Sequence, residues 1–177
     1  MIQPKHLLIL MLLPLLAACA NNDWRTASRA SAGIAPDPRT TPEPVIQVYA
    51  ADAWGWRGIF AVHTWIALKP RNADQYTVYE VVGWRERRGL PVLRIEQDTP
   101  DRHWFGARPE IILDRRGDGV DELISQIKAV AQNYPWKHEY RVFPGPNSNT
   151  FPAWVAQKVP DLQLELPFRA IGSGWAD

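Results

Sequence analysis

The chain has 177 residues, a single cysteine, and 20 basic against 19 acidic residues, which gives a formal net charge of +1. A nearly neutral chain lacks the basic surface by which proteins bind nucleic acid, so we expect no nucleic-acid partner. One cysteine excludes an internal disulfide framework. The length predicts a single domain that buries its own core.

Residues 1–18 have the layout of a secretory signal peptide, with Lys5 before an apolar run that extends from Leu7 to Ala18. The run is shorter than the roughly 20 apolar residues that a spanning helix needs. The residues before Cys19, Leu-Ala-Ala, resemble the bacterial lipoprotein signal, which implies cleavage before this cysteine and its acylation, for example with palmitate. The alternative is an ordinary signal peptide followed by a cysteine without a special role.

A lipidated Cys19 makes the membrane a partner of the chain and places the protein in the cell envelope, facing the periplasm. Asn21 is not the aspartate that resembles an inner-membrane retention signal, so the outer membrane is favoured over the inner. Residues 19–44 are polar and rich in proline, which predicts a stiff tether between the anchor and the domain.

Residues 45–177 are predicted to form one α+β domain, an antiparallel sheet with two or more packed helices. Alternating apolar residues predict strands at 45–50, 59–68, 76–84, 92–97, 110–113 and 139–143, with a short extended piece at 162–166. An apolar stripe predicts a helix at 119–133, stopped by Tyr134 and Pro135, and a second helix follows at 149–158. In the second strand, His63 and Trp65 fall on one face and Thr64 and Ile66 on the other.

The stretch 138–154 predicts a strand, a Pro-Gly turn and a short helix that begins near Ser148. Unpaired N–H groups and the helix dipole at that position favour a developing negative charge, as a nucleophile requires. A nucleophile also needs a base and a group that orients the base. We expect Ser148 as nucleophile, His63 as base, and Glu80 or Tyr79 as the orienting residue.

An alternative interpretation is structural. Asn147, Ser148, Asn149 and Thr150 are residue types that cap helices, and in this interpretation His63 is a core histidine. For substrate binding we select Asn147 and Asn149 beside the nucleophile, Trp65 on the histidine face and Arg57 in a loop. His103 and His138 lack partners at ligand spacing, so we expect neither a metal nor another cofactor.

A strand histidine followed much later by Asn147, Ser148 and Phe151 at a helix start resembles the circularly permuted papain-like proteins. These are relatives of the NlpC/P60 amidases and the lecithin:retinol acyltransferase group. The resemblance implies a cleft in which Ser148 takes the place of the nucleophilic cysteine. The His-Thr-Trp and Pro-Gly-Pro-Asn-Ser-Asn-Thr-Phe motifs also resemble a bacterial lipoprotein family without an assigned activity.

Two hypotheses from different classes follow. In the first, the chain is a serine-variant hydrolase or acyltransferase that acts on amide or ester bonds of envelope material such as peptidoglycan. In the second, it is a binding or assembly lipoprotein that keeps the same scaffold without catalysis. High tryptophan content, nine residues, suits either, since aromatic faces stack on sugar rings and also fill cores.

Overall fold

The structure, a computed structural model, describes residues 23–176. The predicted signal peptide and the lipidation site at Cys19 therefore lie outside the described residues. Within residues 23–176, no helix is both long enough and apolar enough to cross a membrane.

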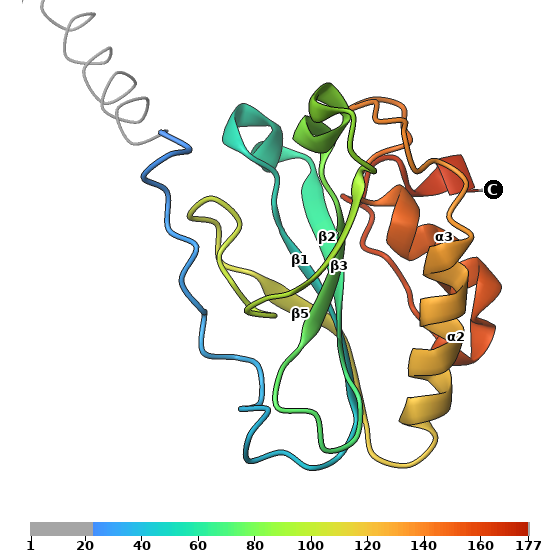
Figure 1. The fold of residues 1–177 in the computed structure, drawn as a ribbon. Helices are drawn as coiled ribbons and strands as arrows, with labels where there is room; N and C mark the ends of the chain where they lie inside the picture. Colours follow the sequence, from blue (N-terminus) through green and yellow to red (C-terminus); the bar gives the residue numbers. More distant parts are fainter. Residues whose placement is uncertain (1–22, 177) are drawn as a thin grey trace, which may run out of the picture.

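The domain is an antiparallel five-stranded sheet with two α-helices on one face, which confirms the predicted α+β class (Figure 1). The strands lie in the order β4-β3-β2-β1-β5. Their bounds are β1 (Val45–Asp52), β2 (Val62–Lys69), β3 (Thr77–Val81), β4 (Leu93–Gln97) and β5 (Glu110–Arg116). The helices are α2 (Val120–Gln132) and α3 (Thr150–Lys158), and four 3-10 helices are η1 (Gly55–Ile59), η2 (Gly83–Arg88), η3 (Pro160–Leu162) and η4 (Ser173–Ala176).

The helices cover the sheet because each presents an apolar stripe to it. In α2, Ile124 and Ile127 are buried and join Ile66 of β2 in the main core cluster. Phe151 of α3 belongs to the same cluster. Burying such side chains contributes about 2 kcal/mol each, so this face stabilises most of the fold.

The opposite face of the sheet holds a second, aromatic core. Trp65 of β2 and Tyr49 of β1 are fully buried and stacked, with ring centroids 5.5 Å apart. The alternation predicted for the second strand is therefore confirmed: Trp65 and Ile66 belong to cores on opposite faces. This aromatic face carries His63 as well.

The described part of the predicted tether packs against the aromatic face instead of standing away from the domain. Asp101 accounts for this contact, because its carboxylate accepts hydrogen bonds from the Ser31 hydroxyl (2.8 Å) and from the N–H groups of Ile34 (2.7 Å) and Ala35 (3.1 Å). We call residues 28–44 the strap. Its Ile34 side chain packs on the aromatic core.

Four predicted strand segments are absent from the structure or shortened in it. Residues 139–143 form an irregular segment, because the Arg141 N–H donates to the carbonyl of Pro146 in the same loop and not to a neighbouring strand. Residues 162–166 are likewise not a strand. The predicted second strand begins three residues late, at Val62, because η1 takes residues 55–59, and η2 replaces the end of the third.

We predict that Asp101→Ala destabilises the protein by about 3 kcal/mol, because three hydrogen-bond donors of the strap lose their charged acceptor. Urea unfolding followed by tryptophan fluorescence measures the change. Asp74→Ala, which removes an exposed carboxylate, is the matched control and should leave the midpoint unchanged. Equal midpoints for the two variants would contradict this account of the strap.

Candidate active site

His63 and Glu80 meet where β2 and β3 separate. The two strands pair only from Ile66↔Tyr79 to Leu68↔Thr77, so their backbones part beyond this point. There His63 Nε2 lies 3.3 Å from Glu80 Oε2, and the two residues are only 5% and 2% exposed. Tyr79 faces the helices and stacks on Phe151. Glu80 is therefore the residue that can orient the imidazole.

Glu80 is the centre of a buried ionic network. Its Oε1 accepts from Arg94 Nη1 (2.7 Å) and from Arg102 Nη2 (2.5 Å). Asp98 bridges the same two arginines, at 2.8 Å from Arg94 Nη1 and 3.0 Å from Arg102 Nε. Burial alone would raise the pKa of Glu80, but the His63 hydrogen bond and the Arg102 charge lower it well below its usual range. The Glu80 carboxylate is thus ionised, and its negative charge is compensated by the two arginines.

His63 is held neutral by its surroundings. Its ring lies flat on Trp104, with centroids 3.5 Å apart and planes at 6°. Burial lowers the pKa of His63, and this effect outweighs the hydrogen bond to Glu80, which raises it. A neutral imidazole facing a carboxylate carries its proton on Nε2. Nδ1 is then the acceptor, and it makes no hydrogen bond with any described residue.

The loop before α3 is hydrogen-bonded to the residues on both sides of His63, to the Thr64 side chain and the Val62 carbonyl. The Thr64 hydroxyl donates to Asn149 Oδ1 (2.9 Å) and approaches the carbonyl of Ser148 (3.4 Å). Asn149 Nδ2 donates to the carbonyl of Val62 (3.0 Å). The structure therefore brings Ser148 and His63 together, and both line one open cavity of about 870 Å³.

The Ser148 hydroxyl is not used to cap the helix. Asn147 Oδ1 instead accepts from the Asn149 N–H (2.9 Å), and Thr150 Oγ1 accepts from the Asn147 N–H (2.9 Å). Within residues 23–176, neither the hydroxyl nor the N–H of Ser148 has a hydrogen-bond partner. Ser148 and His63 thus line the same cavity without a hydrogen bond between them, and Ser148 is 6% exposed.

The residues selected for substrate binding divide into two groups. Arg57 lines the cavity. Asn147, Asn149 and Trp65 do not have free polar groups: the amides of Asn147 and Asn149 both donate to the carbonyl of Ile171, and Trp65 Nε1 donates to that of Pro100 (2.7 Å). These three side chains therefore position the site and leave little surface for a ligand.

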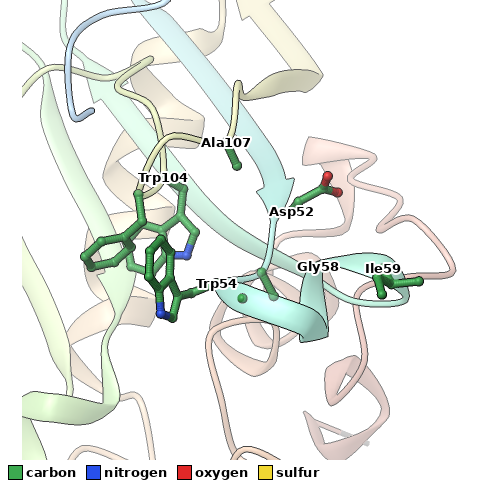
Figure 2. A pocket seen from close by; sticks show the side chains of 9 residues that line it. Asp52, Trp54, Gly58, Ile59, Trp104 and Ala107 are labelled. Atoms are coloured by element: carbon green, nitrogen blue, oxygen red, sulfur yellow. The ribbon is translucent and has the colours of Figure 1, made fainter. Parts of the chain in front are cut away.

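A smaller pocket of about 340 Å³ adjoins the cavity (Figure 2). The two hollows share Trp54 and Trp104 as lining residues. In Figure 2 these indoles gather on one side and Asp52 lies on the other. Asp52 is paired with Arg169 (2.7 Å), so its carboxylate is already engaged. The small pocket is therefore a side pocket of the larger cavity.

Sequence reasoning missed Arg94, Asp98 and Arg102, the charged residues around Glu80. Glu80 and Arg94 are cross-strand partners of the β3–β4 pair, and Asp98 and Arg102 are four residues apart. The opposite charges are visible in the sequence. Their register was not, because η2 separates β3 from β4 and the length of the connection does not fix the pairing.

The described residues contain no cluster of three or more His, Cys, Asp or Glu side chains that could hold a metal ion. Comparison of the sequence with protein families gives a match over residues 43–175 to a family described as "Protein of unknown function (DUF3750)". This range includes every residue of the candidate site. No curated protein and no solved structure matches the chain.

We predict that His63 stays neutral at pH 6, below the ordinary histidine pKa of about 6.5. Because the unfolded chain would take up a proton there and the folded chain would not, acidification through pH 6.5 lowers the free energy of unfolding. Ring ¹⁵N shifts of labelled histidine measure the charge and tautomer, with His63→Gln identifying the signal. Protonation near pH 6.5 would refute the prediction.

We predict that Glu80→Gln lowers the free energy of unfolding by about 3 kcal/mol, because Arg102 loses its buried counter-charge. The lowered pKa of Glu80 gives stability that is complete above its ordinary value and is lost as the pH falls. Part of the acid sensitivity below pH 4 should therefore disappear in the variant. Denaturant titrations at several pH values test this, with Glu165→Gln, an exposed position, as control.

Proposed function

We propose that this chain, which belongs to the DUF3750 family, is a serine hydrolase or acyltransferase of amide or ester bonds. One observation carries the proposal. A serine with an uncommitted hydroxyl and a histidine held by a buried glutamate line the same cavity, although 84 residues separate the serine from Thr64, the neighbour of that histidine. Nucleophile, base and orienting acid are the groups that acyl transfer needs.

The roles follow from the tautomer of His63. Nδ1 accepts the proton of the Ser148 hydroxyl while Oγ attacks the carbonyl carbon of the substrate. The resulting imidazolium is stabilised by Glu80 through Nε2, and it then returns the proton to the leaving amine or alcohol. This step requires Ser148 Oγ and His63 Nδ1 to come within hydrogen-bond reach, and catalytic contacts commonly tighten only with substrate bound.

The start of α3 supplies a donor for the oxyanion. The Ser148 N–H has no partner among residues 23–176, and it lies at the end of the helix where unpaired N–H groups gather. A carbonyl oxygen placed there would receive a hydrogen bond as its charge develops. The donors of Asn149 are committed elsewhere, which makes Ser148 N–H the candidate donor.

The place of action is also a proposal. The resemblance of residues 1–19 to a lipoprotein signal supports acylation of Cys19 and an envelope location, on the outer rather than the inner membrane. A chain held there by its lipid would meet envelope material with amide and ester bonds, peptidoglycan among them. The permuted papain-like relationship is supported by the order of strand histidine and helix-start nucleophile.

A second candidate function, binding without catalysis, is favoured by one observation. Ser148 and His63 are not hydrogen-bonded, and a hydroxyl gains less nucleophilicity from a base than a thiol does. A scaffold that lost its thiol would keep the cavity as a binding site. Labelling chemistry separates the two candidates.

We predict that a fluorophosphonate probe labels the wild-type protein at Ser148 and does not label Ser148→Ala. His63→Gln should reduce labelling by at least about a hundredfold, since the general base is removed. Mass spectrometry of the adduct locates the modified residue. Ser125→Ala, which changes a serine on α2 whose hydroxyl bonds the Asp121 carbonyl, is the control and should label normally. An unlabelled wild type, with folding verified, leaves the binding function as the better account.

A further inference from the structure

The walls of the cavity that holds Ser148 and His63 carry an excess of positive charge. Two glutamates line the cavity, Glu80 and Glu86. Six arginines line it: Arg29, Arg57, Arg85, Arg87, Arg88 and Arg94. The whole chain has a net charge of only +1, so composition does not explain this concentration. Positive walls around a cavity raise the local concentration of anions.

The two glutamates cancel only part of this excess. The charge of Glu80 is already balanced within the buried network, by Arg94 on one side and Arg102 on the other. Glu86 Oε1 accepts from the Tyr140 N–H (3.0 Å), which fixes it at the cavity wall. The arginines outside the Glu80 network therefore dominate the field inside the cavity.

Three of these arginines have free guanidinium groups. Within residues 23–176, Arg57, Arg87 and Arg88 form neither an ion pair nor a side-chain hydrogen bond. Arg57 is half-buried, and its charge reaches Tyr140 on another part of the cavity wall, where it opposes the rise in tyrosine pKa that burial causes. A half-buried cation without a counter-charge is unusual, because it gives up hydration and receives nothing in return.

An aromatic surface adjoins the free arginines. Trp84 lies in η2 with Arg87 and Arg88, and its ring stacks on Trp104 at 5.9 Å with the planes at 20°. Trp84 remains 39% exposed. Trp54 continues the surface through Phe105, at 5.3 Å between centroids. The cavity thus combines an apolar wall with a set of unpaired cations.

We propose that the cavity binds an anionic substrate, whose phosphate or carboxylate group is held by Arg57, Arg87 and Arg88. An apolar or ring-shaped part of the same molecule lies on Trp84 and Trp54. The inference rests on the proposed function only for the position of the scissile carbonyl, which this binding directs toward Ser148. Planar guanidinium groups suit both anions, since they donate paired hydrogen bonds to phosphate and to carboxylate.

Binding of small probes to Ser148→Ala tests the anion site without turnover. The probes are benzyl phosphate, phenylacetate and benzyl alcohol, which place a phosphate, a carboxylate or no charge beside the same ring. Indole N–H signals in NMR spectra report binding, with Trp84→Phe identifying one of them. Benzyl phosphate or phenylacetate should bind at least about tenfold more tightly than benzyl alcohol and should weaken in salt. Equal affinities for all three probes would overturn the proposal.

Arginine variants locate the site. Arg87→Gln with Arg88→Gln, and separately Arg57→Gln, should weaken the preferred anion about tenfold and leave benzyl alcohol unchanged. Arg39→Gln removes an exposed arginine outside the cavity and should have no effect. An equal loss in the Arg39 variant would overturn the proposal. Fluorophosphonate labelling is the separate measure of catalysis. Anion binding without labelling would support the anion site and contradict the hydrolase function. Labelling without a preference for anions would support the hydrolase function and contradict the anion site.

Discussion

The structure depends most on the buried carboxylate of Glu80. This one anion contacts Arg94 of β4, Arg102 of the segment after β4, and His63 of β2. Removing a charge from water costs several kcal/mol, so the anion is tolerated only because these partners surround it. The same partners fix the segment that carries Trp104, whose ring then covers His63. The network therefore sets the fold of this face, and the Trp104 ring that it positions contributes to the burial that lowers the pKa of His63.

A second set of hydrogen bonds connects the start of α3 to the end of β2. Thr64 points toward the helices and His63 toward the aromatic core, because neighbouring residues of a strand alternate. Asn149 holds Thr64 and the carbonyl of Val62 at once, so the start of α3 is clamped across the end of β2. Ser148 precedes that clamp. Its position at the end of β2 is consequently fixed by the Thr64 and Asn149 side chains.

The sequence predicted those parts of the fold that local periodicity controls. The stripe of α2 and the alternation of β2 are strong patterns, and both helices and the sheet class match the expectation. The strand predicted at 139–143 was wrong because the Arg141 N–H bonds within its own loop, to the carbonyl of Pro146. The strap was missed because tertiary hydrogen bonds decide it: the Asp101 carboxylate accepts from the N–H of Ala35, 66 residues away. The arginine partners of Glu80 were missed for the same reason.

The protonation state of His63 bears on why a serine can stand where papain-like proteins have a thiol. A thiol nucleophile works as a thiolate paired with an imidazolium, which requires a charged histidine before the substrate arrives. Here burial opposes a positive charge on His63. The negative charge of Glu80 stabilises an imidazolium only in part, because Arg94 and Arg102 already pair with that carboxylate. A hydroxyl needs the opposite starting point, a neutral base that accepts a proton during attack. The burial that keeps His63 uncharged therefore suits an alcohol nucleophile better than a thiol.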